Sequence, residues 1–339
     1  MNDVLFPSVP STPSETDTGR DLVCEAFRDS DPDGRRAAAV IRATYDQLYD
    51  GQHTGRFRWD QLFKTEKTHF GTLLEINLRR EFDDVIDDPA DGHALDYSVR
   101  GFDVDCKFSQ SFGGWMIPPE CFGHLLLVAW ADDARGTWSL GVVRATEANR
   151  RESVNRDGKT QLSQNGRRQI AWLQFEADLP PNVLLGLDKD TLARILAPKS
   201  GQGRVTEMLR QVTERRIGRN TIATLAQQDD YMARLRDNGN GARTILRREG
   251  YLIPGGDYEA HRRVARQLGV AVPEPGEVLS VRVTPAQENE AWAVELDGRW
   301  WRRIKNGENP SEPAPRLPDV RKPKKGIGTP ILTGSDDDS

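Results

Sequence analysis

Residues 95–109, LDYSVRGFDVDCKFS, carry two aspartates and a lysine at a spacing that can support chemistry. Side chains alternate along a β-strand, so Asp105 and Lys107 share one face of the second half of this segment. A two-residue turn at Arg100-Gly101 would form a hairpin and set Asp96 opposite Asp105. The apolar side chains of both strands then coincide on the other face, which supports this register. The predicted pairs are Val99 with Phe102, Tyr97 with Val104 and Asp96 with Asp105.

Two carboxylates that face each other across a strand pair repel and destabilise the sheet. A divalent metal ion is the obvious compensation, and Mg²⁺, with Mn²⁺ as a substitute, suits one or two carboxylates plus waters and phosphate oxygens. Lys107 would then help to deprotonate the attacking water or stabilise the negative charge that develops. An isolated Asp-x-Lys is common, however, and is equally typical of a solvated strand face with a loose ion pair.

The surrounding elements alternate between helix and strand. Apolar periodicity predicts helices over 35–49 and 65–82, the second with Phe70, Leu73, Leu74 and Leu78 on one stripe. Two apolar runs, 124–131 and 137–145, indicate central strands covered on both faces. This order predicts an α/β (α+β) fold, a mixed sheet flanked by helices, that ends before Pro180-Pro181. The other predicted strands are 93–99, 102–108 and 170–176.

After Pro180-Pro181 the apolar pattern predicts helices between 188 and 249 and then short strands. The helical segments are followed by YLIPGG at 251–256 and by strand-like runs at 277–283 and 292–303. Helices followed by a small hairpin are typical of a winged helix-turn-helix. We therefore predict two domains, a catalytic domain over 35–178 and a mainly helical winged-helix domain over 183–308. The predicted helices are 188–196, 205–216, 220–228 and 242–250.

The net charge of −5 is unevenly distributed. The first 34 residues hold eight acids and two arginines, and we expect an acidic disordered tail there. Residues 143–170 carry seven bases against three acids, and residues 201–270 carry thirteen against eight. Arginine dominates both segments and suits forked contacts with phosphate and guanine, although a salt-bridged surface would look similar. Residues 309–339 have the composition of a second disordered tail.

Three classes of protein are excluded by what the chain lacks. No run approaches the roughly 20 apolar residues that a membrane span needs, so no membrane partner is expected. The start of the chain lacks the basic and apolar regions of a secretory signal. Cys24, Cys106 and Cys121 are an odd number without metal-binding spacing, which fits a reducing compartment and predicts a cytoplasmic protein.

Two longer runs, KTEKTHFGTLLEINLRREF at 64–82 and LDYSVRGFDVDCKFSQS at 95–111, closely resemble the NaeI-type restriction endonucleases of the PD-(D/E)xK superfamily. The likeness extends through 48–63 and 155–173 and continues weakly through the helical half. It implies a restriction-endonuclease-like catalytic domain and a second DNA-binding domain of the winged-helix kind.

Carried over residue by residue, the resemblance gives four site positions. Glu75, in TLLEINL, matches the acid on the active-site helix, and Asp96 matches the first strand acid. Asp105 and Lys107 match the Asp-x-Lys pair, so Glu75, Asp96 and Asp105 are the expected metal ligands. The chain departs from the family by extra residues at 87–92, which we interpret as a loop insertion between Glu75 and Asp96. Without the resemblance, Glu75 would be an ordinary helix-surface carboxylate.

The tetrapeptide LYDG at 48–51 is similar to the KxDG motif of DNA ligases, with Leu48 in place of the lysine. Nucleotidyl transfer needs that lysine as nucleophile, so adenylation is not expected. Asp50-Gly51 is instead typical of a turn.

Two segments are candidates for contacts with DNA. The polar, glycine-broken stretch 155–168 is rich in donors and suits a GC-rich site, although a flexible basic loop would have the same composition. The helix 241–250 would be a recognition helix with Ala242, Ile245 and Leu246 inward, or else an amphipathic helix with a basic solvent face. The candidate DNA-binding residues are Asn155, Lys159, Gln164, Asn165, Arg167 and Arg168 in the first segment and Arg243, Thr244, Arg247 and Arg248 in the second.

These expectations combine into a type II restriction endonuclease that cuts double-stranded DNA at a GC-rich palindrome. The resemblance implies the sequence GCCGGC if the chain follows the family's prototype, and activation by a second copy of the site. A homodimer would match the two-fold symmetry of the site. The alternatives are a non-catalytic winged-helix regulator, and a nicking or repair nuclease on the same fold.

Overall fold

The computed structural model describes residue 13, residues 16–89 and residues 95–318. The chain forms two compact units, one from the residues up to Gln211 together with Gly218–Arg236, and one from Val212–Ile217 together with the residues from Asp237 onward. This division by compactness does not coincide with Pro180-Pro181. The boundary between a catalytic and a DNA-binding domain therefore stays a prediction.

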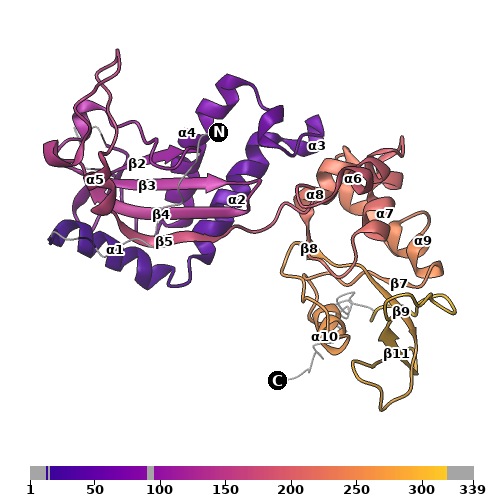
Figure 1. Ribbon diagram of the computed structural model, residues 1–339. Helices are drawn as coiled ribbons and strands as arrows, with labels where there is room; N and C mark the ends of the chain where they lie inside the picture. Colours follow the sequence, from indigo (N-terminus) through magenta and orange to yellow (C-terminus); the bar gives the residue numbers. More distant parts are fainter. Residues whose placement is uncertain (1–12, 14–15, 90–94, 319–339) are drawn as a thin grey trace, which may run out of the picture. The chain divides into compact units, whose positions relative to one another are not determined.

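A mixed five-stranded sheet is the centre of the first unit (Figure 1). Its strands follow the order β1-β2-β3-β4-β5, with β2 and β3 parallel and every other neighbour antiparallel. The mixed α/β fold predicted for this half is confirmed. Strand β1 is shorter than the predicted strand at 93–99, whose first two residues lie outside the described part of the chain. The strands are β1 (Tyr97–Val99), β2 (Phe102–Ser109), β3 (Leu125–Asp132), β4 (Thr137–Arg144) and β5 (Ala171–Asp178).

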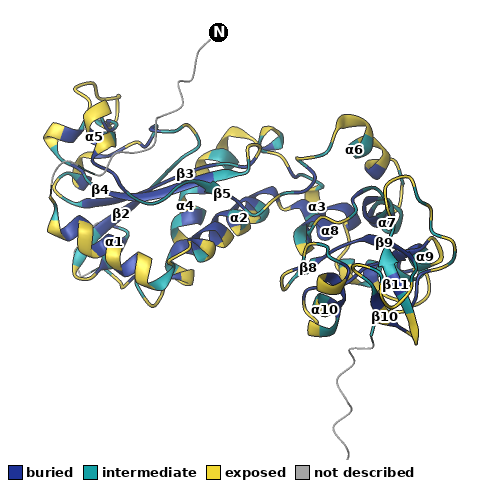
Figure 2. Ribbon diagram, turned by 60° about the horizontal axis from the view of Figure 1, so that its bottom comes forward, coloured by how far each residue is buried: buried dark blue, intermediate teal, exposed yellow. Residues whose placement is uncertain are grey.

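Helices α1 (Thr18–Ser30), α2 (Arg35–Tyr49) and α4 (Lys64–Glu81) cover one face of this sheet. The apolar stripe of α4 is buried as predicted, since Phe70, Leu74 and Leu78 are fully buried, and Leu73 packs against the same cluster. Figure 2 shows that the central strands of the sheet are buried. The helix predictions for 35–49 and 65–82 are thus correct to within one residue at each end.

The opposite face of the sheet is covered by loop segments and not by long helices. Trp115, Ile117 and Cys121 are fully buried there against Leu126 and Val128 of β3. Leu162 and Ile170, which flank the short helix α5 (Gln164–Arg168), join the same cluster. The two faces of β3 are therefore both apolar, as the run at 124–131 predicts.

The prediction of a disordered tail over residues 1–34 is wrong for its second half. Asp17 caps α1 by accepting a hydrogen bond from the backbone of Arg20, and Arg144 of β4 bonds the same carboxylate. Val23 and Phe27 are buried on the sheet. The composition of this stretch, rich in acids and prolines, favoured disorder. The helix was missed because its apolar residues are few, although they lie one turn apart. Residues 1–12 and 14–15 lie outside the described residues.

Four further helices belong to the first unit, and α3 lies directly against α8. Helix α7 begins earlier than predicted and ends at Gln211, so the predicted helix over 205–216 is wrong for its last five residues. The prediction for 188–196 is confirmed, whereas α8 is shorter than 220–228. Their bounds are α3 (Gly51–Thr54), α6 (Lys189–Leu196), α7 (Gly201–Gln211) and α8 (Arg219–Ala226).

The second unit packs α9 (Ala242–Arg248) and α10 (Glu259–Gln267) with a four-stranded sheet of order β10-β11-β9-β7. The predicted strand at 292–303 is a hairpin that turns at Asp297-Gly298. Residues 309–318 are not a disordered tail, because Ala314 is buried and its amide bonds the Arg247 carbonyl. Residues 319–339 lie outside the described part. The strands are β7 (Tyr251–Leu252), β9 (Val281–Pro285), β10 (Val294–Leu296) and β11 (Arg299–Arg303), with β6 (Ile217–Gly218) paired to β8 (Glu277–Val278).

Candidate active site

The hairpin that carries the predicted site has the predicted turn and register. Arg100 and Gly101 both adopt positive φ, 52° and 79°, as a two-residue type I′ turn requires. Three strand pairs follow, Val99 with Phe102, Ser98 with Asp103 and Tyr97 with Val104. Asp96 directly precedes β1, and its carboxylate accepts a hydrogen bond of 2.8 Å from the backbone N–H of Cys106. The turn thus brings Asp96 beside Asp105.

Of the two aspartates, Asp105 is buried and Asp96 is half-buried, and their charges repel each other. Asp105 is only 5% exposed. Burial raises the pKa of Asp96, and the charge of Asp105 raises it further. The Oδ2 atom of Asp105 is buried with no donor aligned for a hydrogen bond, although the Lys107 ammonium is in ion contact with it. This pair of carboxylates therefore has more negative charge than its surroundings compensate.

Lys107 keeps its proton in this environment. Burial lowers the pKa of Lys107, but the contact with Asp105 outweighs it and the pKa is raised above its ordinary value. The ammonium also donates to the backbone carbonyl of Cys106 at 3.3 Å. The resting side chain is a cation and not a free base.

Glu75 reaches the same place from α4. The hydroxyl of Tyr97 donates to the Glu75 carbonyl at 2.6 Å and fixes this turn of the helix to β1. The pKa of Glu75 is raised to about 7, mainly by burial and also by the charge of Asp96, although the charge of Lys107 lowers it. All four predicted residues therefore interact electrostatically, and they come from one helix and one hairpin.

Sequence reasoning missed one neighbour of this group. Cys121, from the loop before β3, is fully buried, and burial followed by the charge of Asp105 raises its thiol pKa to about 12. Nothing in the local sequence of Cys121 indicates this position, because it depends on how the 109–124 segment folds back over the sheet.

These residues fit a hard divalent cation held partly by water. Across residues 16–89 and 95–318, no three histidine, cysteine or acidic side chains are close enough to enclose a metal ion by themselves. Mg²⁺ commonly binds through one or two carboxylates and keeps several waters, so a full protein cage is not required. The repulsion between the two carboxylates, which raises the pKa of Asp96, is what such a cation would relieve.

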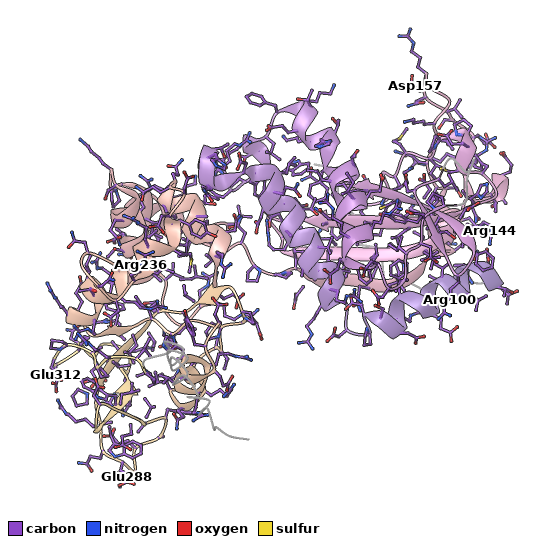
Figure 3. All side chains as sticks on the ribbon, turned by 180° about the vertical axis from the view of Figure 1, so that it is seen from behind. Arg100, Arg144, Asp157, Arg236, Glu288 and Glu312 are labelled. Carbon is purple, nitrogen blue, oxygen red and sulfur yellow. The ribbon has the colours of Figure 1, made fainter. Side chains whose placement is uncertain are left out.

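The predicted DNA-contacting stretch 155–168 is more structured than a flexible loop. Residues 150–162 form an arm, closed by backbone pairing of Arg150 with Leu162, whose outer part includes Asp157 (Figure 3). The side chain of Asn155 accepts from two amides within that turn, so its oxygen is not available to a base. The remaining candidates are exposed, apart from the half-buried Arg167. Lys159 is on the arm, and Gln164, Asn165, Arg167 and Arg168 are on α5.

The candidate recognition helix α9 buries Ala242 and Leu246 as predicted, whereas Ile245 is half-buried. Arg243 was expected to be available to DNA, but this is wrong in the described conformation. Its Nε donates to the Ile253 carbonyl at 3.0 Å, and burial lowers its pKa. The segment after β7 folds back over this guanidinium. Of the other three candidates, Thr244 and Arg247 lie near Asp237, and Arg248 is exposed.

The LYDG segment has a structural role. Leu48 is buried, and Asp50 adopts a positive φ between α2 and α3, so the predicted turn is confirmed. Gly51 packs so closely against Thr224 of α8 that a side chain would collide with it.

Comparison with known proteins agrees with this geometry. The family model "Restriction endonuclease NaeI" matches residues 21–312. The chain is 46% identical over 296 residues to the type II restriction enzyme NaeI of Lentzea aerocolonigenes, covering 85% of this chain and 91% of that protein. No helix among the described residues is long and apolar enough to cross a membrane. The chain belongs to the NaeI family of restriction endonucleases.

Proposed function

We propose that this type II restriction endonuclease hydrolyses DNA with Asp96 and Asp105 as ligands of Mg²⁺ and with Lys107 beside the scissile phosphate. The single observation that carries the proposal is the surplus of buried negative charge at Asp96 and Asp105. A bound Mg²⁺ supplies positive charge to the phosphate and lowers the pKa of a water molecule. Glu75 would orient the attacking water or serve as a further oxygen ligand, and Mn²⁺ would fit the same oxygen-rich site.

Lys107 acts by charge. Because its pKa is raised in the resting protein, the side chain enters the reaction as an ammonium held by Asp105. An ammonium stabilises the negative charge that builds up on the phosphorane oxygens as water attacks. Asp105 and the Cys106 carbonyl hold Lys107 in place, and Asp96 is oriented by the Cys106 amide.

Sequence recognition is divided between two surfaces in this proposal. On the catalytic side, Lys159 and the side chains of α5 reach DNA, and Asn155 shapes the turn that presents Lys159. On the second side, the 183–308 region acts as a winged-helix domain, with Thr244, Arg247 and Arg248 of α9 facing DNA. Arg243 joins them only if the segment after β7 moves away.

The remaining parts of the proposal concern the assembly. The chain acts as a homodimer on a GC-rich palindrome, GCCGGC as in the family's prototype, and a second copy of the site activates cleavage. The protein works in the cytoplasm, where its three free cysteines stay reduced.

The test is cleavage of long duplex DNA by the purified protein with Mg²⁺, with a parallel EDTA sample. Lys107→Ala is expected to lower the rate by about 100- to 1,000-fold. Lys189→Ala, an exposed lysine on α6, is the matched control and should cleave like the wild type. Discrete fragments from the wild type define the site by their ends.

Intact DNA that is still bound with specificity, with Mg²⁺ and with Mn²⁺, would overturn the catalytic roles and favour a DNA-binding regulator. Single-strand breaks alone would favour a nicking enzyme on the same fold.

A further inference from the structure

Two arginines are carried by segments that are hydrogen-bonded to each other, and neither pairs with an acid among the described residues. Arg167 on α5 is half-buried, and Arg151 at the base of the 150–162 arm is exposed. Within residues 16–89 and 95–318, neither guanidinium forms an ion pair with a carboxylate. Burial lowers the pKa of Arg167, and the charge of Arg151 lowers it further. The neighbouring Arg150, in contrast, is paired with Glu147 at 2.5 Å.

The backbone around the two arginines is fixed. The first turn of α5 is capped by Ser163, whose amide bonds the Asn149 carbonyl at 2.8 Å. Gly166 is pressed against the same carbonyl, so a methyl group there would collide with it. The amide of Arg151 bonds Gln161 across the arm at 2.8 Å. The two guanidiniums are therefore carried by segments that are locked together.

Arg167 also lies against the loop that follows the catalytic strand. Its Nη1 occupies the space that a side chain at Gly113 would need, and Gly113 has a φ of 78°. Any other residue at this position would be strained and would displace the guanidinium. The loop after β2 is thus shaped around this arginine.

The arginine pair is on the same side of the sheet as the catalytic residues. Asp105 and Lys107 pair with Leu126 and Val128 of β3, so their side chains project to the face where those two residues are buried. The residues that flank α5, Leu162 and Ile170, pack into the same cluster. A DNA strand bound at the catalytic carboxylates therefore lies over the face that also carries the pair.

We propose that Arg151 and Arg167 together bind one backbone phosphate of the substrate strand beside the cleaved bond. This inference rests on the proposed nuclease function. A guanine edge offers acceptors but no net charge, so it cannot offset the repulsion between two neighbouring cations. A phosphate carries a full negative charge and accepts forked hydrogen bonds from more than one guanidinium. Arg167 is in this view a phosphate-binding residue and not a reader of guanine.

The experiment uses duplexes centred on the site that wild-type fragments define, each with one neutral methylphosphonate in place of a phosphate flanking the cut. Single-turnover cleavage is measured for the full-length wild type, Arg167→Gln, Arg151→Gln and Arg150→Gln. For the wild type we expect one position per strand at which the neutral linkage slows cleavage about 10-fold or more. Arg167→Gln and Arg151→Gln should cleave unmodified DNA about 10-fold more slowly than the wild type. In these variants a methylphosphonate at the sensitive position should no longer slow cleavage, whereas its effect at every other position should be unchanged.

Arg150→Gln should keep the wild-type profile, because Arg150 is already neutralised by Glu147. Arg167→Lys should retain the sensitivity, since a lysine still binds a phosphate as a point charge. If Arg167→Gln melts at a lower temperature than the wild type, the conclusion is drawn from Arg151→Gln, because Arg151 is exposed and its loss should not destabilise the fold.

Two results would overturn the inference while leaving the nuclease intact. One is an unchanged sensitivity profile in both glutamine variants. The other is sensitivity to 7-deazaguanine that disappears in Arg167→Gln while the methylphosphonate profile stays, which would make Arg167 a base reader. Failure of the wild type to cut unmodified DNA would instead contradict the proposed function, and the inference would fall with it.

Discussion

Two clusters of charged side chains lie on the same sheet, and they differ in how many carboxylates surround one cation and in how these groups are hydrogen-bonded. Beyond the end of β3, Asp133 bonds Arg42 and accepts from the Tyr49 hydroxyl at 2.7 Å, and Arg42 also bonds Asp46 at 3.0 Å. No side-chain atom of these four residues is both buried and without a hydrogen-bond partner.

The hairpin cluster has one carboxylate more around its cation. Asp96 and Asp105 face each other, Glu75 is close by, and Lys107 is the single cation that the first two share. The Oδ2 atom of Asp105 lacks an aligned donor. The comparison teaches that burial of charge by itself does not indicate function. A cluster whose charged atoms are hydrogen-bonded to one another fixes the fold, whereas three carboxylates around one lysine are prepared for a cation.

The largest expected effect is the loss of Asp133. Asp133→Ala removes one of the two carboxylates that pair with buried Arg42, together with the acceptor of the Tyr49 hydroxyl, and should lower the free energy of unfolding by about 3–5 kcal/mol. Chemical denaturation of wild type and variant measures this difference. Asp60→Ala, at an exposed carboxylate, is the control and should change little. A loss below about 1 kcal/mol for Asp133→Ala would show that this cluster does not fix the fold.

Asp105→Asn should have the reverse signature. The variant loses a proposed metal ligand, so DNA cleavage should fall by about 100- to 1,000-fold. The metal-free protein should melt at the wild-type temperature or above it, because the repulsion with Asp96 is relieved while Asp96 still attracts Lys107. A clear drop in Tm together with normal cleavage would reverse the roles assigned to the two clusters.

Addition of Mg²⁺ should stabilise the wild type through the hairpin cluster. At 100 times the dissociation constant, a ligand of the native state adds about 2.7 kcal/mol to the free energy of unfolding. Thermal melts with Mg²⁺ and with EDTA measure this gain. It should disappear in Asp96→Asn and persist in Asp60→Asn. A gain of equal size in both variants would place the ion elsewhere.

The smallest expected effect is on pH dependence through Glu75. The folded pKa of Glu75 is raised to about 7 from an ordinary value of 4.5, so its protonated form favours the native state. This contribution is complete below pH 4.5 and is lost as the pH rises to about 7. In EDTA, Glu75→Gln should therefore gain stability relative to the wild type across that window and keep a constant advantage above it. Denaturation at a series of pH values checks the trend, and a constant difference across the series would contradict it.

The catalytic hairpin could be predicted from sequence because alternation and turn length determine its register. Once Arg100-Gly101 is the turn, the pairing of Tyr97 with Val104 follows, and so does the position of Asp96. Glu75 required the family resemblance. The local sequence does not indicate that Tyr97 of β1 bonds this turn of α4 and so places Glu75 beside the aspartates.

The predictions that failed depend on contacts between distant segments. Helix α1 has too few apolar residues to be recognised against its acids, and it is held by Arg144 from β4. Arg243 faces outward on a helical wheel, but the carbonyl of Ile253 reaches it from the segment after β7. Local periodicity does not contain such information. The assignment of individual DNA contacts on α5 and α9 stays a prediction for the same reason.

The type I′ turn at Arg100-Gly101 has a consequence for how this chain can vary. The residues of the turn can change as long as both positions tolerate positive φ. Their number cannot, because β2 is held in register by β3, so one inserted residue would shift β1 by one position and turn Asp96 away from Asp105. Within a lineage, the hairpin should therefore accept substitutions and reject insertions, whereas the 150–162 arm, closed by its own backbone pairs, can lengthen at its tip without disturbing the catalytic strand.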